Sequence, residues 1–172
     1  MTVMIVDYGM GNLGSALRSL ELCGADAIIS PNPSDLKTAS AIVLPGVGAF
    51  GDGMENLRKN GWVEVLRKEI MDSKIPCLGI CLGMQLLADS GTEGTTGEAP
   101  PHQGLGFIKG GVVKLTAKDK SEKIPHVGWN EVNQTAPHAI FSAIDNHKDF
   151  YFVHSYHFVP ASKNTTIATT PY

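Results

Sequence analysis

The first half of the chain alternates short, wholly apolar runs with segments whose apolar residues recur at helical spacing. The apolar runs predict strands, because each is only a few residues long and is bounded by turn-forming or polar residues. They span residues 3–6, 27–29, 40–44 and 75–80. Residues 13–20 predict a helix, and residues 54–74 predict two short helices or one helix broken at Gly61. Strands that are apolar throughout are typical of a parallel sheet covered by helices on both faces.

The second half is richer in strand patterns, which occupy residues 107–115, 128–132, 150–159 and 165–169. Only residues 137–144 suggest a helical turn. Residues 90–106 are rich in Gly, Thr, Pro and Glu and predict a long surface loop. No linker or repeat divides the sequence. We therefore expect one α/β domain, residues 1–172, with a mostly parallel central sheet flanked by helices and with β-hairpins added in the second half.

Composition and charge exclude several classes of function. The chain has 42% hydrophobic residues, 18% charged residues and a net charge of -3, so we expect neither a nucleic-acid partner nor a membrane partner. The N-terminal apolar run lacks the features of a signal peptide, and no apolar stretch is long enough to cross a membrane. The three cysteines lack paired CxxC spacing, which argues against a disulfide framework and a zinc site and indicates a reducing cytoplasm.

Residues 9–14 fit the glycine pattern of a dinucleotide-binding turn, G-x-G-x-x-G, after a predicted strand and before a predicted helix. That fingerprint also needs an acidic residue at the end of the second strand to bind the ribose hydroxyls. Ser30 and Pro31 stand there instead, since Asp26 precedes the strand and Asp35 follows it. We therefore favour glycines that form a tight turn. No cluster of His, Cys, Asp or Glu has metal-ligand spacing, so we predict no cofactor and no metal.

Residues 79–83, Gly-Ile-Cys-Leu-Gly, have the form of a nucleophile elbow, with a predicted strand before them and a predicted helix, residues 82–89, after them. The glycines remove side chains where the backbone turns sharply. The helix directs its positive end at the sulfur of Cys81, which favours the nucleophilic thiolate. The amide of Leu82 is then expected to face the oxyanion that forms on attack.

A buried structural cysteine is the alternative for Cys81, because cysteine behaves as a small hydrophobic residue. The strand–turn–helix context favours the nucleophile instead. Cys77 lies within the predicted strand and Cys23 lies near a helix end, so we interpret both as structural.

Three segments carry the motifs of a known family: residues 45–50 (Pro-Gly-Val-Gly-Ala-Phe), 79–85 (Gly-Ile-Cys-Leu-Gly-Met-Gln) and 125–130 (Pro-His-Val-Gly-Trp-Asn). They resemble class I glutamine amidotransferases. With residues 7–12 and 151–156, they are similar in particular to the glutaminase subunits of imidazole glycerol phosphate synthases, which belong to histidine biosynthesis. The resemblance implies hydrolysis of glutamine to glutamate and ammonia through a γ-glutamyl thioester on Cys81.

The resemblance also implies roles for other residues of these motifs. Residues 46–48 are expected to form the oxyanion strand, in which Gly46 contacts substrate and Gly48 supplies an amide beside that of Leu82.

The glutamine itself is expected to contact two further motifs. By resemblance, Gln85 lies against the bound glutamine, and the backbone around Ser155 and Tyr156 lies against its α-amino and α-carboxylate groups. A solvated helix position is the alternative for Gln85, because polar helix residues are mostly exposed.

The ammonia consumer implied by the resemblance is a cyclase subunit of the (β/α)8-barrel type. The loop of Asn12 and the segment with Trp129 and Asn130 are expected to face this barrel, and an aromatic residue beside amide side chains suits an interface anchor. Simple core packing is the alternative for Trp129, and a hydrogen-bonded histidine beside a proline turn is the alternative for His126.

The chain departs from the family pattern near its end. The family's general base and its orienting acid lie in a later His-Pro-Glu strand, and no His-Pro-Glu occurs here. His154 belongs to the substrate motif and His157 lies just past it, so neither is assigned as the base. We expect the sequence to be truncated at its C-terminus, without the last strands and helix. Two alternative functions remain, ammonia delivery to another acceptor, such as a sugar-modifying synthetase, and a catalytically silent scaffold.

Overall fold

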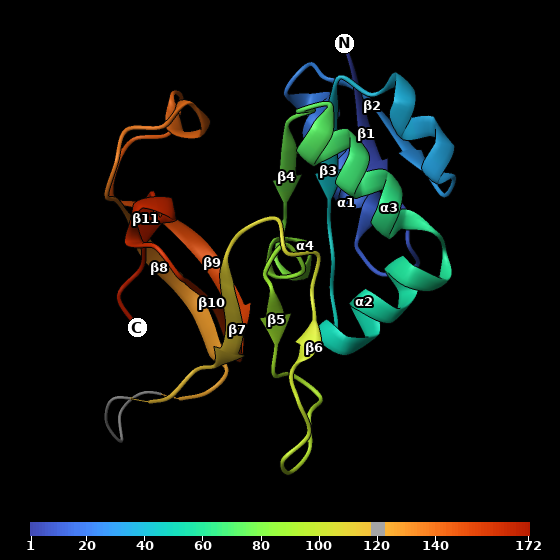
Figure 1. Ribbon diagram of the computed structural model, residues 1–172. Helices are drawn as coiled ribbons and strands as arrows, with labels where there is room; N and C mark the ends of the chain where they lie inside the picture. The colour runs from blue at the N-terminus through green and yellow to red at the C-terminus, as the bar shows by residue number, and fades with distance from the viewer. Residues whose placement is uncertain (118–122) are drawn as a thin grey trace.

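A computed structural model describes residues 1–117 and 123–172 of the chain. Its centre is a parallel sheet with the strand order β2-β1-β3-β4 (Figure 1). The strands span Thr2–Val6 (β1), Asp26–Ser30 (β2), Ala41–Leu44 (β3) and Cys77–Gly79 (β4). The predicted strands of the first half are therefore confirmed, and their ends differ from prediction by one or two residues.

Burial on both faces holds only at the centre of this sheet. Ile5 in β1 and Val43 in β3 are buried, whereas Ile28 in β2 is 47% exposed and Leu78 in β4 is 41% exposed. The expectation of strands covered on both faces is therefore wrong for the outer strands, because each has one face that its neighbours leave open to solvent.

Helices on the two sides of the sheet follow the predicted pattern. Helix α1 (Leu13–Leu22) packs on β1 and β2. The predicted break in the next helical segment is confirmed, because Gly61 has a φ of 74°. The segment forms α2 (Phe50–Lys59), α3 (Trp62–Leu66) and a π-helical turn η2 (Arg67–Asp72), and a 3-10 helix η1 (Pro33–Thr38) precedes β3.

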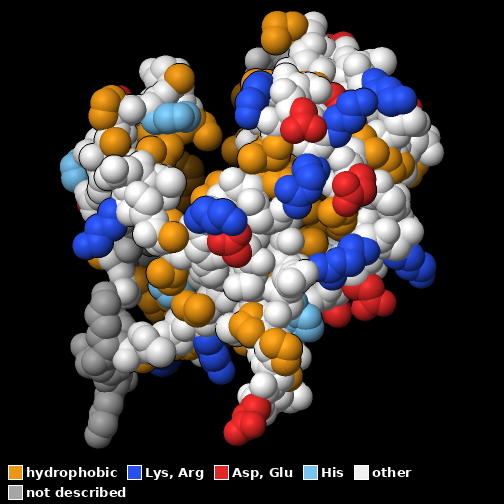
Figure 2. Space-filling model, viewed as in Figure 1, with side chains coloured by type: hydrophobic (Ala, Val, Ile, Leu, Met, Phe, Trp, Pro, Cys, Tyr) orange, Lys and Arg blue, Asp and Glu red, His pale blue; other side chains and the backbone are white. Residues whose placement is uncertain are grey.

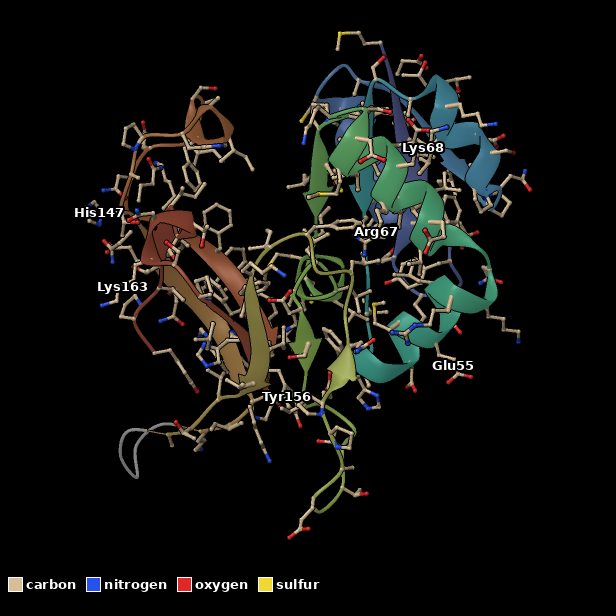
Figure 3. All side chains as sticks on the ribbon, viewed as in Figure 1. Glu55, Arg67, Lys68, His147, Tyr156 and Lys163 are labelled. Atoms are coloured by element: carbon tan, nitrogen blue, oxygen red, sulfur yellow. The ribbon has the colours of Figure 1, made fainter. Side chains whose placement is uncertain are left out.

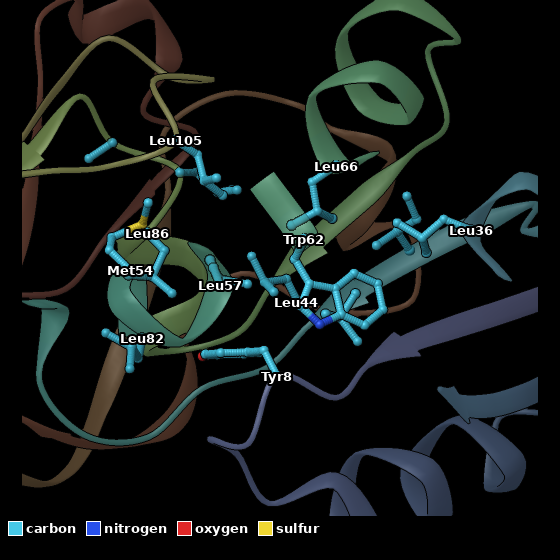
Figure 4. Close-up of a cluster of buried hydrophobic side chains, with 14 of the residues drawn as sticks. Tyr8, Leu36, Leu44, Met54, Leu57, Trp62, Leu66, Leu82, Leu86 and Leu105 are labelled. Carbon is cyan, nitrogen blue, oxygen red and sulfur yellow. The ribbon is translucent and has the colours of Figure 1, made fainter. Parts of the chain in front are cut away.

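The main core lies where α2, α3 and the short helix α4 (Leu82–Gln85) meet the sheet (Figure 4). Its largest side chains are fully buried and come from all of these elements: Tyr8, Phe50, Ile42, Leu44, Leu36, Met54, Leu57, Trp62, Leu66, Leu82 and Leu86. This apolar cluster fixes the ends of β1, β3 and β4 relative to one another. The predicted site segments follow directly after these strands: residues 7–12 after β1, residues 46–48 after β3 and Cys81 after β4.

The second half builds two further sheets beside the parallel one (Figure 1). One has the order β10-β7-β5-β6, formed by Tyr156–Pro160, Gly110–Lys114, Ser90–Gly91 and His102–Gln103. The other has the order β11-β8-β9, formed by Ala168–Thr169, His126–Gln134 and Lys148–His154. Strands β8 and β9 are antiparallel and consecutive, which confirms a hairpin in this half. Short 3-10 helices η3 (Ala139–Phe141) and η4 (Lys163–Thr165) connect the strands, and η3 matches the predicted helical turn.

Three predictions for this half are wrong in detail. Residues 150–159 form two strands that separate at Ser155, because β9 pairs with β8 whereas β10 pairs with β7 in another sheet. Residues 90–106 are not loop throughout, since β5 and β6 lie within them and pair with each other. The pattern at 165–169 shortens to β11, because η4 occupies its start.

Candidate active site

Cys81 occupies a sharp turn between β4 and α4. Its φ of 53° and ψ of -117° are unusual for a residue with a side chain, and the residue is exposed. Backbone strain of this kind persists where the surrounding structure fixes it, and it clusters at active sites. The predicted strand–turn–helix context is present, and the alternative of a buried structural cysteine is wrong for Cys81. Cys77 is half-buried in β4, and burial raises the pKa of its thiol to about 11. Cys23 is exposed at the end of α1, so the structural interpretation of it as buried is wrong.

Helix α4 is a single turn and not the predicted helix of residues 82–89. Its last turn tightens, because the Leu87 amide donates to Met84 and the Ala88 amide to Gln85, and the Asp89 amide donates to Gly110 instead of to the helix. The carbonyls of residues 86–88 accept from the returning chain at residues 105–108. Leu86 and Ala88 are thereby buried beside the sheet instead of continuing the helix. The dipole that faces Cys81 is accordingly that of one helical turn.

Both glycines of the elbow are required by close contacts. A Cβ on Gly79 would lie 2.6 Å from Cα of Met84, and a Cβ on Gly83 would overlap the main-chain carbonyl of Leu44. The elbow therefore packs directly on the end of β3, where the next predicted segment begins.

Gly46, the first residue of the segment 46–48, lies beside the elbow. A Cβ on Gly46 would lie 2.9 Å from both the Leu82 Cβ and the Gly83 amide nitrogen, so the two segments are in contact. Gly46 is buried, whereas Val47 and Gly48 are exposed, and Gly48 has a φ of 108° that favours glycine. The oxyanion role of Gly48 and Leu82 stays a prediction.

Gln85 is buried and joins the elbow to the second half of the chain. It is 8% exposed, and its side-chain amide donates to the Tyr156 carbonyl at 3.1 Å. The alternative of a solvated helix position is therefore wrong. Figure 3 labels Tyr156 at the start of β10, directly after Ser155, whose carbonyl accepts a hydrogen bond from the Leu115 amide. The contact brings together the residues assigned to glutamine by resemblance, whereas the binding of glutamine to them stays a prediction.

A chain of hydrogen bonds continues from Tyr156 through two histidines. His154 Nδ1 lies 2.9 Å from the Tyr156 carbonyl, and because a carbonyl only accepts, this nitrogen carries the proton. His154 Nε2 lies 3.0 Å from His126 Nδ1, and His126 Nε2 lies 2.8 Å from Oδ1 of Asn130. His126 is thus a buried, hydrogen-bonded histidine, as its alternative interpretation held. Both ring nitrogens of His154 are thus engaged in hydrogen bonds.

A family model described as "Glutamine amidotransferase class-I" matches residues 4–171. The chain belongs to this family. Its sequence is 45% identical over 155 residues to the imidazole glycerol phosphate synthase subunit HisH 1 of Campylobacter jejuni (strain RM1221), covering 90% of the chain and 74% of the relative. It is 44% identical over 174 residues to the subunit HisH 1 of Methanococcus maripaludis, covering 99% of the chain and 81% of the relative.

Solved structures of low identity share the amidotransferase fold. A structure titled as a glutamine amidotransferase has a TM-score of 0.72 at 16% identity, covering 96% of this chain and 78% of its own. PurLQS from Thermotoga maritima has a TM-score of 0.71 at 18% identity, covering 98% of this chain and 74% of its own. The predicted α/β fold class is therefore confirmed.

The three residues assigned to the partner of the amidotransferase lie in different settings. Trp129 is 70% exposed, which rules out core packing, and its ring lies edge-on to that of Tyr151 with centroids 5.6 Å apart. Asn130 follows it on β8 and faces the opposite side of the strand, where it bonds His126. Asn12 is exposed and caps α1, accepting from the Ser15 amide at 3.3 Å. Only Trp129 and Asn12 thus offer side chains to a partner, whose contact with them stays a prediction.

Two residues that contact the predicted site segments, Glu93 and Tyr8, were not identified by the sequence analysis. Glu93 accepts a hydrogen bond from the Phe50 amide at 3.0 Å, which satisfies the start of α2 directly after the oxyanion segment. The methyl side chain of Ala49, at the N-cap of α2, cannot accept a hydrogen bond from the helix amides. An alanine at this position was therefore a signal in the sequence that a remote group caps the helix. Tyr8 lies buried beneath Gly46. It lies just after the first predicted strand, residues 3–6, and no local pattern there indicated a contact with Gly46.

The glycine-rich turn after β1 fits a tight turn. Gly9 has a φ of 88°, and its amide donates to the Asp7 carboxylate at 3.0 Å. Gly14 has open space around its Cβ position, so it is not needed for close packing of the kind a dinucleotide turn uses. Among residues 1–117 and 123–172, no group of three or more His, Cys, Asp or Glu side chains is placed to hold a metal ion.

A cavity of about 720 Å³ lies beside the elbow helix, lined by Met84, Leu115, His126, His154, His157, Thr170 and Tyr172 among others. Figure 2 shows the surface hollowed between the part that holds β8, β9 and β11 and the part that holds the parallel sheet. Burial, together with the neighbouring His154, lowers the pKa of His157 below its ordinary value. No helix within the described chain is long and apolar enough to cross a membrane.

Proposed function

We propose that this chain is the glutaminase subunit of an imidazole glycerol phosphate synthase, in which Cys81 releases ammonia from glutamine for a cyclase subunit. The observation that carries the proposal is the exposed Cys81 in a strained elbow, on a chain that is 41–45% identical over most of its length to relatives named as this subunit. Ammonia delivery to a different acceptor is not favoured, because these relatives are all named as the HisH subunit of imidazole glycerol phosphate synthase.

The proposed reaction has two stages. The Cys81 sulfur attacks the carboxamide carbon of glutamine, the C–N bond breaks, and the nitrogen takes a proton and leaves as ammonia. Water then attacks the γ-glutamyl thioester, and glutamate leaves with the thiol restored. The amide of Leu82 and an amide of residues 46–48 stabilise the oxyanion in both stages, because Leu82 directly follows Cys81 and Gly46 packs against Leu82.

The partner, compartment and domain organisation are part of the same proposal. The cyclase is a (β/α)8 barrel that forms a heterodimer with this chain through Trp129 and the Asn12 loop, and it makes imidazole glycerol phosphate and an aminoimidazole carboxamide ribonucleotide. We place the enzyme in the cytoplasm, since Cys23, Cys77 and Cys81 are all free thiols. The chain acts as a single amidotransferase domain, and glutamine is its substrate.

The testing experiment incubates labelled glutamine with the chain, with and without a cyclase barrel, and measures glutamate. We expect hydrolysis with the barrel and little without it, because residues 46–48 form no hydrogen bond with the described residues that would hold them in a productive orientation. Cys81→Ala is expected to lower hydrolysis by about 10³-fold or more, while synthesis from added ammonia persists. Cys23→Ala is the matched control and retains hydrolysis. Near-wild-type hydrolysis by Cys81→Ala contradicts the assignment, and a wild-type complex that consumes ammonia but not glutamine favours the silent scaffold.

A further inference from the structure

Tyr8 carries a buried hydroxyl for which the described residues provide no hydrogen-bond partner. The residue is fully buried just after β1, and among the described residues its hydroxyl oxygen makes no hydrogen bond. A buried donor without an acceptor is costly, and most native structures avoid one. Phenylalanine fills the same space without that cost, so core packing alone does not explain the hydroxyl.

The Tyr8 hydroxyl lies at the contact between the oxyanion segment and the elbow. Its oxygen is the atom nearest to the Cβ position of Gly46, and the same position is close to Leu82 and Gly83. Figure 4 shows the Tyr8 ring directed toward Leu82. Burial and the nearby Cys81 both raise the pKa of Tyr8 far above its ordinary value. The hydroxyl therefore keeps its proton at any working pH and remains a donor.

The oxyanion segment, residues 46–48, is not held by hydrogen bonds to the described residues, so its peptide planes can rotate. Within the described chain, no amide or carbonyl of Gly46, Val47 or Gly48 forms a hydrogen bond. Two of its three residues are glycine, for which rotation of a peptide plane is sterically cheap. Such a rotation exchanges the directions of an N–H and a C=O group. When the amide turns outward to a substrate, the paired carbonyl turns inward to the buried side and needs a donor there.

We propose that Tyr8 is a positioning residue for the oxyanion hole, whose hydroxyl donates to the carbonyl of Gly46 when the Gly46–Val47 peptide plane turns the Val47 amide toward the glutamine carboxamide. The hydroxyl is unpartnered in the resting arrangement because its acceptor arrives only with that turn. Tyr8 thus lowers the free energy of the productive arrangement without touching the substrate. This inference rests on the proposed glutaminase function.

The test is Tyr8→Phe, which removes only the hydroxyl, in the complete chain bound to the cyclase barrel. Labelled glutamine is mixed with the complex, the reaction is quenched in acid, and label retained on Cys81 reports formation of the thioester. We expect the rate of thioester formation and kcat to fall about 10- to 100-fold, with KM for glutamine little changed, because the hydroxyl acts on an oxyanion donor. Alkylation of Cys81 by iodoacetamide, which forms no oxyanion, is expected to be unchanged.

A second buried site is tested with Trp62→Phe, which removes the indole nitrogen together with part of a fully buried ring. That nitrogen is the other buried side-chain donor without a partner in the described chain. The substitution lies in α3 and is expected to leave thioester formation unchanged. Tyr8→Phe should keep or raise the melting temperature, because it removes an unsatisfied group. Equal thioester formation by wild type and Tyr8→Phe, or a loss accompanied by a lower melting temperature or altered alkylation, overturns the positioning role. A wild-type complex that forms no thioester instead overturns the proposed function, so the two failures are distinct.

Discussion

At the scale of single residues, the histidines of the second half differ in how they are held. His126 and His154 are fixed in a chain of hydrogen bonds that ends at Gln85. His157 lines the same cavity, and its ring forms no hydrogen bond with the described residues. Its pKa is lowered by burial first and by His154 second. The fold therefore opposes protonation of His157.

The lowered pKa of His157 makes the free energy of unfolding depend on pH. The folded pKa of His157 lies below the unfolded value of about 6.5, so the unfolded chain binds the proton more tightly. The stabilisation is present above about pH 6.5 and is lost as the pH falls from there through the folded pKa. We expect His157→Gln to have a smaller loss of unfolding free energy between pH 7.5 and pH 5.5 than wild type, measured by urea unfolding. Equal losses in the two proteins would show that His157 does not contribute.

At the scale of elements, the elbow depends on the approach of α4 to the end of β3. The main-chain contact between Gly83 and Leu44 leaves no room for a methyl group, and Leu44 also accepts the amide of Ile80 at 2.9 Å. The positions of the sulfur and of the oxyanion segment are thus set by one tight junction. A change in that junction is expected to affect folding and chemistry together.

We predict that Gly83→Ala lowers the free energy of unfolding by more than about 2 kcal/mol, because a Cβ there overlaps backbone that has no side-chain freedom to move. The matched control is Gly14→Ala in α1, where the Cβ position is open and the backbone is helical. That control is expected to be neutral or to stabilise by up to about 1 kcal/mol. Urea unfolding of both variants measures the difference, and similar values for the two substitutions would contradict the tight junction.

At the scale of the whole molecule, the outer face of the β8–β9 hairpin is apolar and open. Its exposed side chains are Val127, Trp129, Tyr151 and Val153, which are cross-strand neighbours in the antiparallel pair. Contiguous apolar patches of this kind mark sites of interaction. The opposite face of the hairpin carries His126 and Phe152, which stack at 4.9 Å and face inward. The hairpin thus links an outer surface to the cavity beside the elbow.

For this surface, Trp129→Ala is expected to weaken binding to the cyclase barrel by about 30-fold or more, as for an aromatic interface anchor. The unfolding free energy of the free chain should change by less than about 0.5 kcal/mol, because the side chain is largely exposed. Calorimetric titration measures the affinity, and Leu22→Ala, at an exposed apolar position on α1, is the control. Unchanged affinity for Trp129→Ala would remove Trp129 from the interface.

The sequence by itself determined the parts of this protein that depend on local pattern. Apolar runs between turn residues marked β1, β2, β3 and β4, and Gly61 marked the break between α2 and α3, since these features follow from side-chain periodicity and backbone freedom. The Gly-Ile-Cys-Leu-Gly motif identified Cys81, because a sharp turn between strand and helix needs glycine on both sides. The family also followed from such motifs.

Only the tertiary structure decided what depends on partners far along the chain. Residues 150–159 carry one continuous strand pattern, and they divide at Ser155 because two different sheets supply the hydrogen bonds. The helix after Cys81 stops at Gln85, and the residues after it bond remote strands, since the Asp89 amide donates to Gly110 and the carbonyls of residues 86–88 accept from residues 105–108. The hydroxyl of Tyr8 lies beneath Gly46. Each of these contacts joins residues remote in sequence, and no local pattern encodes which remote group arrives.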